Sequence, residues 1–181
     1  MPSLVRRALA RATGTLPDAL VEGDLAAALA RYQAHYTECL GRETRPFPGL
    51  SAALNRLVAM GFPLAVVTNK ASRFVRPHLE GAGIAHCFAA VVGGDDLPAK
   101  KPDPAQLLHV AARLRVPIER LLMVGDSAND ARAARSAGCP VVLLPHGYNE
   151  GRPVQDVDAD GIVDSLAAVA DCVRYVTPES P

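Results

Sequence analysis

Four short apolar runs, each preceded by a segment with helical spacing, constrain the fold of this 181-residue chain more than any other feature. The runs are PLAVV, FAAVV, LLMV and PVVLL, and the segments before them are SAALNRLVAMG, RFVRPHLEGAG, PAQLLHVAARL and NDARAARSAG. Because the runs are apolar throughout, we expect strands that are buried on both faces. The alternation predicts an α/β fold with a doubly wound, mostly parallel sheet, completed by a short strand at 161–163 and a helix from Ser165.

The residues before this region predict helices alone. From Ser3 to about Gly41, Ala, Leu and Arg recur with helical spacing, as in LAAALARYQAHYTECL, and no strand-like run occurs. The stretch TRPFPG that follows is typical of a connector, because proline and glycine interrupt regular structure. We therefore expect a helical part, residues 1–43, followed by an α/β part, residues 44–181.

Composition excludes several classes of partner. Nineteen Lys and Arg residues balance nineteen Asp and Glu residues, and no basic run is longer than a pair. This distribution argues against binding to nucleic acid or to an anionic membrane, so a small-molecule partner is expected. Four widely spaced cysteines without a CxxC pair, in a chain without a secretory signal, favour the cytoplasm.

Polar side chains follow three of the apolar runs. Thr68 and Asn69 come directly after PLAVV, and Lys101 lies in the loop that follows FAAVV. Asp126 comes directly after LLMVG, and Asp130 lies four residues further on. Since the carboxyl ends of parallel strands meet at one edge of a sheet, these five residues are expected to form one site.

The residue types at this edge suit phosphate chemistry. A threonine hydroxyl and an asparagine amide beside a helix start can bind phosphate oxygens, and Lys101 can neutralise charge that develops during phosphoryl transfer. Asp126 and Asp130 offer the hard oxygen ligands that Mg²⁺ prefers. Taken alone, the two aspartates would fit helix N-capping and compensation of the helix dipole. Their position beside Thr68 and Lys101 favours a metal site.

Three motifs carry a resemblance to a known family. VVTNK, AKKPDP and VGDSANDARAA resemble, in this order and each at a strand end, the second, third and fourth motifs of the haloacid dehalogenase (HAD) superfamily of phosphatases. The longer stretches GGDDLPAKKPDP and AGCPVVLLPHGYNEG resemble its phosphoglycolate phosphatase branch. The resemblance covers Phe47 to about Asp171, and residues 1–43 resemble the second half of the helical cap of that branch.

The resemblance assigns a role to each site residue. It implies that Thr68 and Asn69 bind the transferring phosphoryl group and that Lys101 steadies the phosphate and the nucleophile. It also implies that Asp126 binds Mg²⁺, with Asp130 in support. The implied substrate is a small phosphorylated metabolite such as 2-phosphoglycolate; pyrophosphate and sugar phosphates are the alternatives within the family.

One family motif has no counterpart in this sequence. These enzymes open with a strand ending in DxDGT, whose first aspartate is the nucleophile and whose second is the general acid and base, and nothing before Thr68 matches it. The absent strand would lie between PLAVVT and LLMVG, so two strand edges would face a gap. We expect, in descending order, a misplaced start of the sequence, a fragment, or a true shortened relative. The last would be a non-catalytic protein that binds phosphate or Mg²⁺, because it lacks nucleophile and proton donor.

The acidic stretch DVDADGIVDS contains a DxD, Asp156 to Asp158, but a Gly- and Pro-containing loop precedes it in place of a buried strand. A calcium loop of the EF-hand type is a second interpretation, which fails at position twelve, where Ala167 replaces the bidentate glutamate. We expect a solvated turn that leads into the short strand, with Asp164 or Ser165 capping the last helix.

Two further observations bear on the site. A response-regulator receiver also combines Asp, Thr and Lys at strand ends, but there the aspartate comes first, whereas the order here is Thr68, Lys101, Asp126. The chain also contains only three lysines, Lys70, Lys100 and Lys101, among nineteen basic residues. Such a bias favours lysine where a compact ammonium is required.

Overall fold

The computed structural model describes residues 2–42, 44–147, 149 and 153–173, and the chain divides into two compact units, Met1–Arg45 and Pro46–Pro181. Residues 148, 150 and 151 of the predicted motif AGCPVVLLPHGYNEG lie outside the described residues, as does residue 152. No helix within the described ranges is both long enough and apolar enough to cross a membrane.

The first unit is helical, as predicted. Helix α1 (Pro2–Thr13) and helix α2 (Glu22–Cys39) pack against each other around a short 3₁₀ turn at Pro17–Ala19. Val5, Ala10 and Leu25 are buried between them. Each of these helices has one apolar stripe, and pairing the stripes removes them from water.

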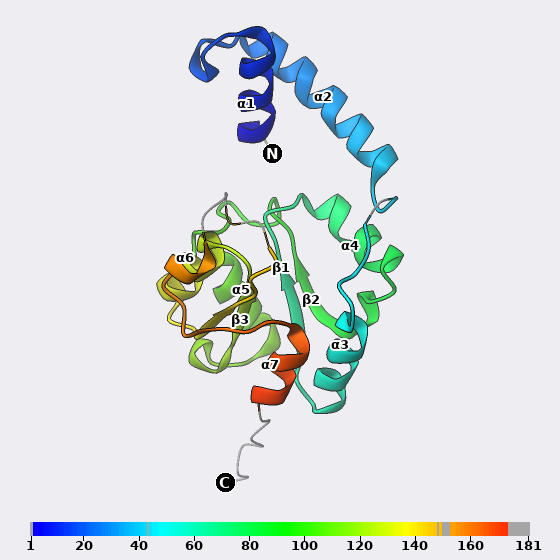
Figure 1. The fold of residues 1–181 in the computed structure, drawn as a ribbon, viewed down its shortest axis with the longest axis vertical. Helices are drawn as coiled ribbons and strands as arrows, with labels where there is room; N and C mark the ends of the chain where they lie inside the picture. The colour runs from blue at the N-terminus through cyan, green and yellow to red at the C-terminus, as the bar shows by residue number, and fades with distance from the viewer. Residues whose placement is uncertain (1, 43, 148, 150–152, 174–181) are drawn as a thin grey trace. The chain divides into compact units, whose positions relative to one another are not determined.

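The second unit alternates helices and parallel strands (Figure 1). Its helices are α3 (Leu50–Ala59), α4 (Ser72–Gly81), α5 (Ala105–Leu114), α6 (Ala128–Ala137) and α7 (Leu166–Cys172). Its strands are β1 (Leu64–Val67), β2 (Phe88–Val92), β3 (Met123–Gly125), β4 (Val141–Leu143) and β5 (Gly161–Ile162). Short 3₁₀ turns lie at Ala85–Cys87, Ile118–Arg120 and Val154–Asp156. The predicted α/β class is confirmed.

The strands form two sheets, β1-β2 and β3-β4-β5, and every pair is parallel. The break falls between β1 and β3, the two strands that were expected to flank the absent central strand. Among the described residues, no strand pairs with the open edge of either β1 or β3. This is the gap between two strand edges that was expected from the absent strand, and within the described residues it divides the parallel strands into two sheets.

Helices cover the strands and bury them. Helix α5 packs on β1 and β2, α6 packs on β3 and β4, and α3 and α7 lie side by side although they are far apart in the sequence (Figure 1). Val141 and Leu143 of β4 and Ala133 and Ala134 of α6 are completely buried. Alanine at these positions of α6 lets the helix approach the strands closely. This packing fixes the strand ends from which the predicted site residues project.

Helix α6 begins and ends where its sequence specifies. Ser127 is the N-cap, and Asp130 at the third helical position accepts a hydrogen bond from the Ser127 backbone N–H at 3.1 Å. Gly138 ends the helix in the left-handed conformation, with φ of 79°. Such acidic N-terminal partners and C-terminal glycines satisfy the backbone groups that a helix leaves unpaired at its ends.

Candidate phosphate and metal site

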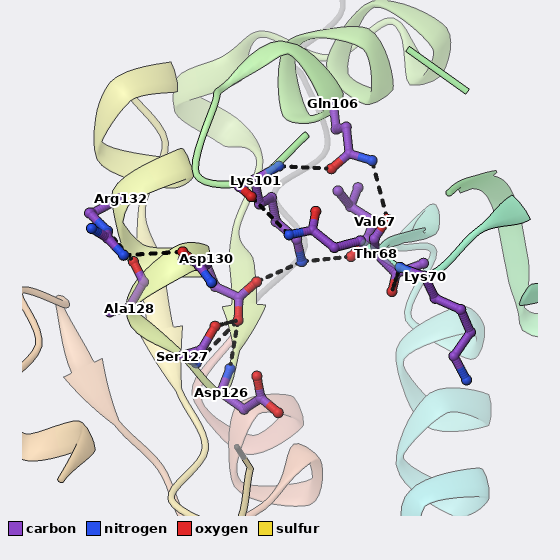
Figure 2. A network of polar contacts seen from close by, with 12 residues as sticks. Val67, Thr68, Lys70, Lys101, Gln106, Asp126, Ser127, Ala128, Asp130 and Arg132 are labelled. Atoms are coloured by element: carbon purple, nitrogen blue, oxygen red, sulfur yellow. Dashed lines mark hydrogen bonds and ion pairs between the residues drawn. The ribbon is translucent and has the colours of Figure 1, made fainter. Parts of the chain in front are cut away.

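The predicted site residues come from three places in the second unit that the fold brings together (Figure 2). Thr68 follows β1, Asp126 follows β3, and Lys101 lies in the loop between β2 and α5. The five predicted residues thus come from the ends of strands in both sheets and from the start of α6. Their proximity agrees with the rule that loops at the carboxyl ends of parallel strands meet.

The ammonium group of Lys101 connects the two sheets. Its Nζ donates to the Val67 carbonyl oxygen at 2.8 Å and to Asp130 Oδ1 at 2.6 Å (Figure 2). The side chains of Lys101 and Asp130 are only 10% and 5% exposed. A lysine so deeply buried requires a paired carboxylate, because an unpaired charge away from water is strongly destabilising. The ammonium is therefore held rigidly beside the end of β1.

The loop after β1 is tied to Lys101 through its backbone. Asn69 Nδ2 donates to the Lys101 carbonyl oxygen at 2.8 Å, and the Thr68 hydroxyl accepts from the Lys70 backbone N–H at 3.1 Å. The Asn69 amide thus holds the Lys101 loop, a contact that the sequence did not suggest. That Thr68 and Asn69 bind a phosphoryl group stays a prediction.

Asp130 is occupied by hydrogen bonds on both of its oxygens. Oδ1 accepts from Lys101, while Oδ2 accepts from the Asp126 and Ser127 backbone N–H groups, each at 3.1 Å, and from the Ser127 hydroxyl at 2.7 Å. Burial works against the charged form, but the Lys101 ammonium and these hydrogen bonds lower the pKa of Asp130 below its ordinary value. A metal could bind Asp130 directly only by displacing one of these donors.

That Asp126 binds Mg²⁺, with Asp130 in support, stays a prediction. Two glycines make room around the two aspartates. A Cβ at Gly147 would lie 2.0 Å from Asp126 Cβ, and a Cβ at Gly125 would lie 2.4 Å from Asp130 Cβ. The sequence gives no obvious signal for either glycine, because the close approach arises only in the folded chain.

The carboxylate oxygens at this site are of the type that Mg²⁺ prefers. No cluster of three or more His, Cys, Asp or Glu side chains with metal-binding geometry occurs in the described part of the chain. Mg²⁺ does not require such a cluster, since it keeps several waters and uses one or two carboxylates together with substrate phosphate oxygens. Asp126, beside the Lys101–Asp130 pair, can supply one such carboxylate.

One residue of this network was missed by the sequence analysis. Gln106 lies in the first turn of α5, is completely buried, and hydrogen-bonds to the Lys101 backbone N–H (Figure 2). The only signal in the sequence was a polar residue on the otherwise apolar face of AQLLHVAARL, next to Leu107.

The acidic stretch after β4 has a structural role, as expected. Arg135 of α6 donates to Asp158 at 3.0 Å and to Asp160 at 2.8 Å, and Asp160 also accepts from the Val141 backbone N–H at 2.7 Å. These contacts fasten the turn to α6 and β4 and lead it into β5. The Ser165 hydroxyl accepts from the Ala168 N–H at 3.2 Å and caps α7, which confirms the expected cap. Because Arg135 donates to both carboxylates, the stretch is arranged as a turn that is hydrogen-bonded to α6. It is not arranged as a calcium loop.

Comparison with known proteins identifies relatives over nearly the whole chain. The family model for haloacid dehalogenase-like hydrolases matches residues 3–138. A phosphoglycolate phosphatase from Thiobacillus denitrificans is 45% identical over 92% of this chain and 72% of its own length. One from Nitrosospira multiformis is 47% identical over 90% of this chain and 70% of its own length.

A solved structure agrees with these sequence relatives. The crystal structure of a predicted phosphoglycolate phosphatase from Haemophilus somnus superposes with a TM-score of 0.84 and 35% identity, over 90% of this chain and 71% of the solved chain. The chain therefore spans somewhat over two thirds of the length of these three relatives.

Proposed function

The chain belongs to the haloacid dehalogenase-like hydrolase family and is related to its phosphatases, and from this premise we propose that it serves the Mg²⁺-dependent hydrolysis of 2-phosphoglycolate or a similar small phosphomonoester. The proposed substrate rests on the relatives named above. The proposed chemistry rests on the site itself.

The observation that carries the proposal is the buried ammonium of Lys101 beside the loop after β1. Its Nζ is 2.8 Å from the Val67 carbonyl oxygen, and Thr68 and Asn69 follow immediately in the chain. A fixed positive charge at this place stabilises a phosphoryl group as negative charge builds up on its oxygens, without the energetic cost of reorienting water. We propose that the Thr68 hydroxyl and the loop backbone bind the same oxygens.

Asp126 and Asp130 have different roles in this proposal. Asp126 would hold Mg²⁺, which supplies charge neutralisation to the phosphate when bound. Asp130 would act through Lys101, because its two oxygens already hold Lys101 and Ser127. The 181 residues contain no strand ending in DxDGT, so we assign the nucleophile and the proton donor to none of them.

Two alternatives lead to different measurements. A protein that binds phosphate and Mg²⁺ without catalysis would use the same Lys101 and Asp126. A pyrophosphatase or a sugar-phosphate phosphatase would use the same strand-end residues with a different cap. We propose that the helical unit, residues 1–43 by sequence, is part of such a cap.

The experiment uses the protein as its source cells produce it, because no nucleophile is assigned within the 181 residues. It measures phosphate release from 2-phosphoglycolate, pyrophosphate and a hexose phosphate, with Mg²⁺ and with EDTA. In parallel, calorimetry measures the binding of inorganic phosphate in the presence of Mg²⁺. Asp126→Asn is the test variant and Asp18→Asn, at an exposed position of the helical unit, is the matched control. Mg²⁺-dependent release that Asp126→Asn abolishes and Asp18→Asn preserves supports the proposal. Binding without release supports the non-catalytic alternative, and neither binding nor release contradicts both.

We propose the cellular compartment from the state of the cysteines. All four are unpaired; Cys87 and Cys139 are buried, and Cys39 and Cys172 are exposed. Exposed free thiols are typical of a reducing compartment. We therefore place the protein in the cytoplasm, which fractionation of its source cells would test.

A further inference from the structure

Gln106 is a buried amide where the loop after β1 meets the loop between β2 and α5. Its side chain is 0% exposed, although it lies in the first turn of α5 on a face with Leu107 and Val110. Burying an amide is unfavourable unless its hydrogen bonds are made. A glutamine in this position therefore requires a reason beyond packing.

Within the described residues, the hydrogen bonds of this amide go to the backbone of the site. Oε1 accepts from the Lys101 N–H at 3.3 Å, and Nε2 donates to the Thr68 carbonyl at 3.2 Å and to the Gly93 carbonyl at 2.7 Å. The partners fix the orientation of the amide, since an N–H requires the oxygen and two carbonyls require the nitrogen. One side chain thus joins the loops after β1 and after β2 to the segment that carries Lys101.

These bonds control the position of the Lys101 ammonium relative to the loop after β1. The Lys101 peptide is held at its N–H by Gln106 and at its C=O by Asn69. The side chain then reaches the Val67 carbonyl, one residue before Thr68 (Figure 2). Because Gln106 also holds the Thr68 carbonyl, it fixes both ends of this arrangement. Errors of about 1 Å in such an arrangement are costly for phosphate chemistry.

We propose that Gln106 is a positioning residue that sets the spacing between the Thr68–Asn69 loop and the Lys101 ammonium, and that this spacing determines phosphate affinity. This inference rests on the proposed function, since it assumes that phosphate binds between these groups. Gln106 itself does not contact the phosphate in this proposal.

The test measures the affinity for inorganic phosphate with Mg²⁺ by calorimetry. Gln106→Met keeps the length of the side chain and removes its hydrogen bonds, while Gln155→Met makes the same change at an exposed position. We expect Gln106→Met to bind phosphate at least about tenfold more weakly and Gln155→Met to bind as the wild type does. Thermal unfolding of each variant verifies that it is folded.

A second variant provides a readout that a purely structural role would not move. In Gln106→Glu, burial and the two facing carbonyls raise the pKa of the new carboxyl, so it becomes protonated at mildly acidic pH. The protonated carboxyl can donate to one carbonyl and accept from the Lys101 N–H. The ionised carboxylate can accept from the Lys101 N–H but cannot donate to either carbonyl. Relative to the wild type at the same pH, we expect phosphate binding to be weaker by about tenfold at pH ~8 and by no more than about threefold at pH ~5.5.

The outcomes separate the inference from the proposed function. If the wild type binds phosphate and Gln106→Met binds it equally well, the inference is wrong and the proposed function stands. If the wild type does not bind phosphate at all, the proposed function fails and the inference fails with it. If Gln106→Met does not fold, Gln106→Glu decides the question. The inference is overturned if the phosphate affinity of Gln106→Glu, relative to that of the wild type, is the same at both pH values.

Discussion

The Nζ of Lys101 lies 2.6 Å from Asp130 Oδ1, and the two side chains are 10% and 5% exposed. This pair is the link between the end of β1 and the start of α6. No hydrogen bonds between β1 and β3 contribute to that link in the described residues, because the two strands belong to separate sheets. The pair therefore combines two tasks: it keeps the ammonium at the site, and it joins the two halves of the α/β unit.

Removing the ammonium should cost much more stability than removing its neighbour. Lys101→Met leaves Asp130 buried without its cation, for which the expected loss is about 3–5 kcal/mol in the free energy of unfolding. Lys100→Met removes an exposed ammonium one residue away, with an expected change within about 0.5 kcal/mol. Urea unfolding of the two variants and the wild type measures both values. Similar losses in the two variants would contradict the structural role of the pair.

Acid should weaken the fold through Asp130. Burial opposes the charged form of this carboxyl, but the Lys101 ammonium and the Ser127 hydrogen bonds lower its pKa below the ordinary 3.8. Because the folded-state pKa lies below the unfolded value, the stabilisation is complete above about pH 4 and is lost as the pH falls through the folded pKa. Asp130→Asn, which does not titrate, should lose less stability than the wild type between pH ~5 and pH ~2.

The measurement is the free energy of unfolding at a series of pH values, compared between the wild type and Asp130→Asn. Asp95 and Asp160 also have lowered pKa values, and both are present in the two proteins. Their contributions therefore cancel in the comparison. Parallel pH curves for the two proteins would show that Asp130 does not contribute to acid sensitivity.

Gly94 should be irreplaceable for a steric reason. A Cβ at this position would lie 2.3 Å from the Asn69 carbonyl oxygen and 2.6 Å from its carbon. Gly94 N–H also donates to the Lys70 carbonyl at 2.7 Å, so the two loops cannot separate without losing this bond. Gly94→Ala should lower the free energy of unfolding by roughly 1–3 kcal/mol and displace the loop that follows β1.

The matched control for Gly94 is Gly81, the last residue of α4. A Cβ at Gly81 would contact nothing within 4 Å, so Gly81→Ala should be neutral or stabilising by up to about 1 kcal/mol. Thermal melts of both variants give the comparison. A melting temperature for Gly94→Ala equal to that of Gly81→Ala would mean that the two loops can move apart freely.

The sequence predicted those parts of the site that depend on strand ends. Thr68, Lys101 and Asp126 each follow an apolar run, and parallel topology alone brings such residues together. Gln106 escaped prediction because its partners, Thr68 and Gly93, are 38 and 13 residues away in the sequence and are backbone carbonyls, which carry no sequence signal. The gap between β1 and β3 followed from the absent DxDGT strand, and not from the apolar runs, because an apolar run predicts that a strand is buried but not which strands lie beside it.

The acidic turn after β4 should stabilise the contact of this segment with α6 and β4 and should not bind calcium. In the part of the chain that the structure describes, Asp158 hydrogen-bonds to Arg135 alone, whereas Asp160 hydrogen-bonds to both Arg135 and the Val141 backbone N–H. We therefore expect Asp160→Ala to melt at a lower temperature than Asp158→Ala, because only the former leaves the N–H at the start of β4 without its carboxylate. Calorimetry should give no saturable Ca²⁺ binding in the wild type. Saturable binding that Asp158→Ala abolishes would instead support the calcium-loop interpretation, and it would require Arg135 to leave the two carboxylates that it holds in this structure.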